Sequence, residues 1–286
     1  MLRRALAFTL VLFPPAPSAS GPLLTVFDTD PGTRFGGALD LAGDCDGDGV
    51  GDFAVGAYRS GGGAGALHVV SGADGALLWT LAGRGNDWLG YDVAGAGDLD
   101  GDRVPDVLVG APFEGGAVGV VRALSGRDGR VLWSRSGSAP GERYGQALAG
   151  IGDVDGDWVP EVAVGVPFDG SGGTYAGRVE LLSGLDGSLR WTVQGASFDQ
   201  LGYDVAGVGD LDADGAGDCA IGAPFDDRGA QNAGALVIVS GASGVRLFEI
   251  FGETAGDWLG QRVAGAGDVD GDGIPEVLAS APGADL

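Results

Sequence analysis

Four carboxylates at positions one, three, five and nine of a short acidic pattern occur together five times in this chain. The last copy reads GDVDGDGIPEV and starts at Gly267. Alternate residues of a tight turn can point toward one centre, so these carboxylates are expected to converge at a point that only a cation could tolerate. The pattern therefore predicts a turn held together by a metal ion.

The predicted ligands are all oxygen atoms, which indicates a hard cation. Ca²⁺, with about six to eight oxygen ligands and flexible geometry, fits better than Mg²⁺. A main-chain carbonyl near position seven should complete each site, and up to five Ca²⁺ ions are expected. The predicted ligands are the carboxylates of Asp44, Asp46, Asp48, Asp52, Asp98, Asp100, Asp102, Asp106, Asp153, Asp155, Asp157, Glu161, Asp210, Asp212, Asp214, Asp218, Asp268, Asp270, Asp272 and Glu276, and the carbonyls of Val50, Val104, Val159, Ala216 and Ile274.

The acidic pattern could also belong to a turn without metal or to a helical calcium site. Aspartate and glycine suit solvated turns that bind no metal, although such a turn needs one aspartate and these loops carry four carboxylates. A helix–loop–helix calcium site would need a bidentate glutamate at position twelve, which is apolar in every copy. The residues at that position are Val55, Val109, Val164, Ile221 and Ala279.

The acidic loops mark an internal repeat, because their first aspartates, at 44, 98, 153, 210 and 268, lie 54, 55, 57 and 58 residues apart. In the second unit, apolar runs begin at Leu89, Asp106, Val118 and Arg130, and Asp128-Gly129 is typical of a hairpin turn. Helical periodicity is absent outside the N-terminus. The sequence thus predicts an all-β propeller of four-stranded antiparallel blades.

Aromatic residues recur in step with these units. Trp79, Trp133 and Trp191 occupy one place in the predicted fourth strand, and Phe248 stands there in the fourth unit. This recurrence favours packing between blades.

Composition and the N-terminus indicate where the chain works. Residues 1–20 have the layout of a secretory signal peptide, and the repeats fill residues 21–286, with the last unit incomplete. We therefore expect a secreted or cell-surface protein with no membrane span in the mature chain. The net charge of −24 and the lack of lysine make nucleic acid an improbable partner. Cys45 and Cys219 lie in or beside loops of non-neighbouring units and are expected to be unpaired.

Two further signatures flank each acidic loop, and together they resemble the FG-GAP repeats of the integrin α-chain β-propeller family. The resemblance covers roughly residues 22–286 and implies that the loop carboxylates bind calcium. The first signature reads Phe35-Gly36, Leu89-Gly90, Tyr144-Gly145, Leu201-Gly202 and Leu259-Gly260; the second reads Gly56-Ala57-Tyr58, Gly110-Ala111-Pro112, Gly165-Val166-Pro167, Gly222-Ala223-Pro224 and Ser280-Ala281-Pro282.

The family forms seven-bladed rings, whereas this chain holds about five blades' worth of strands. Residues 22–28 resemble a fourth strand, so either a five-bladed ring closes or the blades form an incomplete arc of the seven-bladed type. We expect the arc, whose open blade faces could promote self-association.

The resemblance implies a non-catalytic module for adhesion or ligand binding, with an extracellular protein or polysaccharide as partner. The alternative is the propeller part of a secreted calcium-dependent enzyme such as a polysaccharide lyase. One histidine, no lysine and no GxSxG element are present, so no catalytic constellation is visible. We therefore expect that the chain is not an enzyme.

Overall fold

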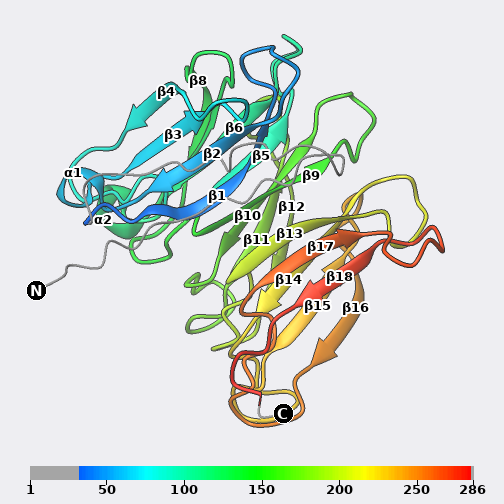
Figure 1. Ribbon diagram of the computed structural model, residues 1–286. Helices are drawn as coiled ribbons and strands as arrows, with labels where there is room; N and C mark the ends of the chain where they lie inside the picture. The colour runs from blue at the N-terminus through cyan, green and yellow to red at the C-terminus, as the bar shows by residue number, and fades with distance from the viewer. Residues whose placement is uncertain (1–31, 285–286) are drawn as a thin grey trace, which may run out of the picture.

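The computed structural model describes residues 32–284, which form four four-stranded antiparallel sheets and one two-stranded sheet (Figure 1). The first four sheets are named blades one to four. Blade one holds β1 (Phe35–Gly43), β2 (Asp52–Ala57), β3 (Ala66–Val70) and β4 (Leu77–Ala82); blade two holds β5 (Val93–Gly97), β6 (Asp106–Ala111), β7 (Val120–Leu124) and β8 (Val131–Ser136); blade three holds β9 (Ala147–Gly152), β10 (Glu161–Val166), β11 (Arg178–Leu182) and β12 (Leu189–Gln194); blade four holds β13 (Asp204–Gly209), β14 (Asp218–Ala223), β15 (Ala235–Val239) and β16 (Arg246–Phe251); the last sheet holds β17 (Val263–Gly267) and β18 (Glu276–Ala279).

The second strand of each blade lies at the centre of the core. Strands β2, β6, β10 and β14 are buried along their whole length. A strand covered on both faces reads as a continuous apolar run, as VLVGA does in β6. The fourth strands β4 and β8 instead alternate between exposed and more buried residues, because each borders solvent.

The blades are arranged in an open arc. Their first strands contact one another in chain order, from β1 to β5, β9, β13 and β17. In Figure 1, blade one and the last sheet lie at opposite ends of this arc. The expectation of an all-β, incomplete propeller is thus confirmed, whereas the predicted signal peptide and the strand at residues 22–28 lie outside the described residues.

The two glycine signatures meet at the junctions between blades. The Gly90 N–H donates to the Gly110 carbonyl at 3.0 Å, and Leu89 forms a parallel bridge to Gly65 of the preceding blade. A Cβ on Gly110 would lie 2.1 Å from the Gly145 carbonyl oxygen of blade three. Only glycine permits this backbone approach. The sequence predicted that the first strand of blade two begins at Leu89, but the strand begins at Val93. The prediction was wrong because Leu89 pairs with Gly65 of blade one.

Two four-residue helical turns were not predicted from the sequence. They are α1 (Ser60–Gly63) and α2 (Glu114–Ala117), and both lie between the second and third strands of a blade. The first contains three glycines with positive φ and the second contains two, so they are tight turns without helical periodicity.

Tryptophans on the fourth strands join each blade to the next, which confirms the predicted inter-blade packing. The Trp133 Nε1–H donates to the Gly184 carbonyl of blade three at 2.6 Å, and its ring lies against Gly187. Trp79 and Trp191 make the equivalent bonds to Gly126 and Gly241, at 2.6 and 2.8 Å. Phe248, the residue in blade four, has no such donor and is 58% exposed.

We predict that Gly110→Ala lowers the free energy of unfolding by about 1 to 3 kcal/mol, because the new methyl group overlaps the Gly145 carbonyl oxygen. Gly51→Ala is the matched control, since nothing lies within 4 Å of a Cβ at that position. Denaturant unfolding of the two variants measures the difference. Equal stability would contradict this account of the glycine signature.

Trp133→Phe is expected to cost about 1 to 2 kcal/mol, because it removes one buried hydrogen bond and part of the inter-blade contact. Trp158→Phe changes the same atoms at a side chain that is 89% exposed and should leave stability unchanged. Equal melting temperatures for the two variants would refute the role given to Trp133.

Candidate metal centres

The acidic loops join the first and second strands of every sheet. Loop one, for example, runs from the end of β1 at Gly43 to the start of β2 at Asp52. Since the blades share one strand order, all five loops lie along the same side of the arc, at the upper right of Figure 1. They are named acidic loops one to five in chain order.

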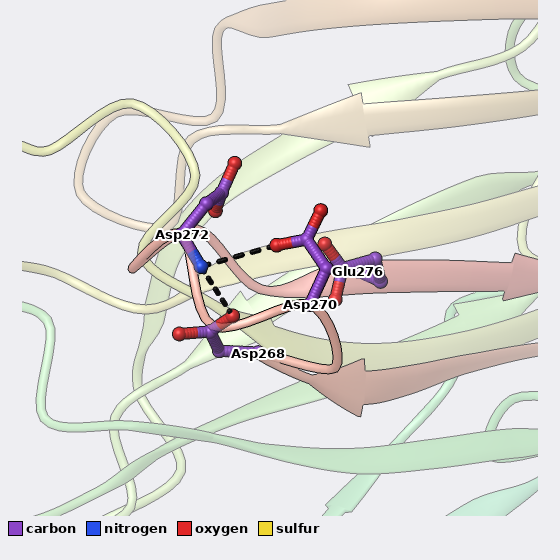
Figure 2. Close-up of side chains that lie close together, drawn as sticks. All are labelled: Asp268, Asp270, Asp272 and Glu276. Atoms are coloured by element: carbon purple, nitrogen blue, oxygen red, sulfur yellow. Dashed lines mark hydrogen bonds between the residues drawn. The ribbon is translucent and has the colours of Figure 1, made fainter.

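The carboxylate at position one fixes the backbone of its own loop. In acidic loop five, Asp268 Oδ1 accepts N–H groups of Gly271 and Asp272 at 2.7 and 3.1 Å, and Oδ2 accepts that of Gly273 at 2.9 Å. Figure 2 shows the bonds that the Asp272 N–H makes to Asp268 and Asp270. Such bonds from backbone N–H groups to an aspartate carboxylate are typical of aspartate-rich turns, and they hold the backbone of the loop in a tight turn.

Positions three and five use one oxygen each for such bonds. Asp270 Oδ1 accepts the Asp272 N–H at 3.1 Å, and Asp272 Oδ1 accepts the Ile274 N–H at 2.8 Å. The Oδ2 atom of each carboxylate takes no part in these bonds and can contact a cation. The N–H of Ile274, at position seven, is thus bonded to the Asp272 carboxylate. The expectation that the main-chain carbonyls at position seven bind the ion stays a prediction.

The structure brings carboxylate oxygens of every loop to within 4.8 Å of one another. Loop five gathers all four positions, loop one gathers positions one, three and five, and loops two to four gather positions one, three and nine. Asp52, Asp102, Asp157 and Asp214 therefore lie outside these closest groups. The groups are Asp44, Asp46 and Asp48; Asp98, Asp100 and Asp106; Asp153, Asp155 and Glu161; Asp210, Asp212 and Asp218; and Asp268, Asp270, Asp272 and Glu276.

In acidic loops one, two and four, position nine is a buried aspartate tied to two parts of its blade. Asp106 is fully buried; its Oδ2 accepts the Leu99 N–H at 2.7 Å and its Oδ1 accepts the Gly126 N–H at 3.0 Å. One side chain therefore holds the acidic loop to the start of the β7–β8 turn. Burial raises the pKa of Asp106 to about 6.

Glu161 departs from this arrangement in loop three. It is also fully buried, and its Oε2 accepts the Val154 N–H at 2.8 Å. Its Oε1, however, accepts no hydrogen bond from any residue that the structure describes. Burial raises the pKa of Glu161 to about 7, and the nearby Asp155 carboxylate adds to this rise.

These features fit a hard divalent cation. The donor atoms are all oxygens, they converge from one loop, and a buried carboxylate oxygen of Glu161 is left without a hydrogen-bond donor among the described residues. A bound Ca²⁺ would neutralise the repulsion among the carboxylates and give that oxygen a partner.

Arginines that were not predicted from the sequence also contact these loops. Arg127 Nε donates to Asp102 Oδ2 at 2.8 Å, and Arg130 pairs with Asp100. In blade three, Arg190 pairs with Asp155 and lies 3.5 Å from Glu161. A signal for Arg190 was available, because leucine stands at the same place in the other three blades.

The cysteines offer no alternative metal chemistry. Cys45 and Cys219 are free and buried, which confirms that they are unpaired. Burial raises the pKa of both thiols to about 12, so both stay protonated at neutral pH.

Comparisons with known proteins agree with the repeat pattern. The FG-GAP repeat family matches residues 89–131 and 259–285. Integrin alpha-PS2 of Drosophila melanogaster is 34% identical over 169 residues, which cover 55% of this chain and 12% of that protein. Integrin alpha-5 of Xenopus laevis and integrin alpha-V of Gallus gallus are each 29% identical over 70% of this chain and 20% of their own length.

This chain thus spans a fifth or less of these relatives. Among residues 32–284, no helix has the length and apolar character needed to cross a membrane. The repeats, the open propeller and the relatives lead to one conclusion: the chain contains FG-GAP repeats and resembles the integrin alpha chains.

Proposed function

We propose that the chain is a non-catalytic, extracellular β-propeller module that binds calcium in its acidic loops and engages a ligand in adhesion. The observation that carries the proposal is the convergence of carboxylate oxygens within 4.8 Å in all five loops. Repulsion at such distances is strong, and a repeated cluster of this kind is explained most simply by a cation.

Calcium is favoured over other divalent ions by the donor set and by the compartment. The clusters offer oxygen atoms alone and include carboxylates that are part of the loop backbone network, which suits the flexible coordination of Ca²⁺. The proposed signal peptide at residues 1–20 would deliver the chain to surroundings that contain calcium. The proposed ligands are the carboxylates of the five clusters together with the position-nine and position-five residues outside them.

The similarity to integrin alpha chains supports a role in recognition. The net charge of −24 disfavours nucleic acid, and an extracellular protein or polysaccharide is the proposed partner. Val269 of acidic loop five and Leu278 of β18 are 70% and 61% accessible, and we propose that these apolar side chains take part in self-association. Light scattering over a range of protein concentrations tests that last point.

An enzymatic role is disfavoured because the carboxylates are committed to the loops and the described thiols are buried. A screen of uronate-containing polysaccharides for unsaturated products, followed by ultraviolet absorbance, tests this part of the proposal. Steady product release that a chelator abolishes would overturn it in favour of a calcium-dependent lyase.

Calcium is expected to raise the melting temperature of the full chain. If each site sees calcium at ten times its dissociation constant, linkage contributes about 1.4 kcal/mol per site. Differential scanning fluorimetry with calcium or with excess EGTA measures the shift. An identical melting temperature in the two buffers would reject calcium binding to the folded chain.

Asp212→Asn isolates one loop in the same assay. The amide oxygen of the new asparagine can still accept the Asp214 N–H, which lies 3.1 Å from Asp212 Oδ1 in the parent chain. The substitution removes one negative charge from the loop-four cluster. We expect the calcium-dependent gain to fall by about 1 kcal/mol. Glu253→Gln removes a charge at an exposed site outside the loops and should leave the gain intact.

The pH dependence of metal-free stability follows from the position-nine carboxylates together with the buried Asp92, whose pKa burial raises to about 7. The folded-state pKa values of Asp106 and Glu161, about 6 and about 7, exceed those of the unfolded chain, so the folded chain binds more protons. Stability should therefore fall as pH rises through that window. Thermal melts of resin-stripped protein between about pH 5 and pH 8 measure this slope, which Glu161→Gln should flatten. A metal-free melting temperature that rises across the window would contradict the assignment.

A further inference from the structure

Blade three differs from the other complete blades at two positions, one at the end of its acidic loop and one on its fourth strand. The side chains at these two positions lie close to each other. Position nine is Glu161 where the other three blades have aspartate. The fourth strand of each complete blade has a β-bulge before its tryptophan or phenylalanine. The bulged residue is a partly buried leucine in the other three blades (Leu78, Leu132 and Leu247) and is Arg190 in blade three.

The guanidinium group of Arg190 lies against the proposed ligands of loop three. Its Nη1 pairs with Asp155 Oδ2, and its Nη2 lies 3.6 Å from Asp157 Oδ2 and 3.5 Å from Glu161 Oε1. That Oε1 is the buried atom with no hydrogen-bond donor among the described residues. The arginine therefore shares its carboxylate partners with the proposed ion.

A divalent ion and a guanidinium group beside the same oxygens repel each other. The Arg190 side chain is 34% exposed and lies at a strand bulge, so it can turn toward solvent when another cation takes its place. The leucines of the other blades carry no charge and cannot compete in this way.

We propose that Arg190 is a tethered cation that competes with Ca²⁺ for acidic loop three. Calcium binds this loop by displacing the guanidinium group, so the loop has a lower calcium affinity but keeps its shape when calcium is scarce. The proposal rests on the calcium-binding function proposed above and adds a graded response, in which loop three fills after the loops without an arginine.

Acidic loop two carries a weaker form of the same arrangement. Arg127 and Arg130 pair with Asp102 and Asp100, but their side chains are 58% and 56% exposed. Ion pairs at such exposure contribute little, so they should compete less than Arg190. Both oxygens of Asp106 are also already bonded to backbone N–H groups, unlike those of Glu161.

The chain contains a reporter for this loop. Trp158 follows Asp157 directly, and its backbone N–H donates to Asp153 Oδ2 at 3.0 Å. Excitation of tryptophan sensitises the luminescence of Tb³⁺ bound nearby, and Ca²⁺ added in excess displaces the Tb³⁺. The part of the signal that Trp158→Phe removes belongs to loop three.

The experiment compares Arg190→Gln with Arg84→Gln, which removes the same charge from an exposed position outside the acidic loops. We expect Arg190→Gln to bind Tb³⁺ and Ca²⁺ at loop three about three- to tenfold more tightly than the parent chain. Arg84→Gln should bind as the parent does. The melting temperature of Arg190→Gln in a chelator should fall below that of Arg84→Gln, because the loop has lost its tethered cation.

The outcomes separate this proposal from the function on which it rests. Equal loop-three affinities for Arg190→Gln and Arg84→Gln, or weaker binding by Arg190→Gln, would overturn the competition while calcium binding stands. A chain that binds neither ion in any variant would refute the proposed function itself. Isothermal titration with Ca²⁺ alone gives a second readout that needs no tryptophan.

Discussion

Repulsion among carboxylates is the constraint on which the acidic loops depend. Each loop places three or four carboxylate groups with oxygens within 4.8 Å of one another, and acidic loops one to four lie directly beside a fully buried second strand such as β6. Backbone N–H groups and arginines offset part of this repulsion. The loops are thus positioned by the core, and their charge acts directly on the strands that form it.

The junctions between blades impose a different constraint, which is steric. The glycine at the start of the second signature, Gly110 for instance, contacts the backbone of the next blade at Gly145. On the outer side, Trp133 bonds to the backbone of the same neighbour. Each blade is therefore completed by the next one, which is why Phe248 of blade four remains exposed beside the two-stranded last sheet.

The repeat spacing and the apolar runs were enough to predict the four-stranded antiparallel blades. The bounds of β5 could not be predicted, because the start of the strand is set by a backbone contact between Leu89 and Gly65 of another blade. The turns α1 and α2 depend on paired glycines in positive φ, which carry no helical periodicity.

The acidic residues of the candidate site were also visible in the sequence, but their environment was not. A one-dimensional pattern cannot show that Asp106 is buried with both oxygens bonded while one oxygen of Glu161 lacks a donor among the described residues. Nor does it show that a bulge in β12 brings Arg190 to the loop of its own blade. Those relations arise from strand register, which only the folded chain defines.

Counting the calcium ions bound to the folded chain tests most directly whether these loops are metal centres. Native mass spectrometry of the calcium-equilibrated protein reads this number from the mass. The proposed function predicts several bound ions, up to one for each of the five acidic loops, and their loss after treatment with a chelator. A folded chain that carries no calcium at millimolar concentrations would contradict the account.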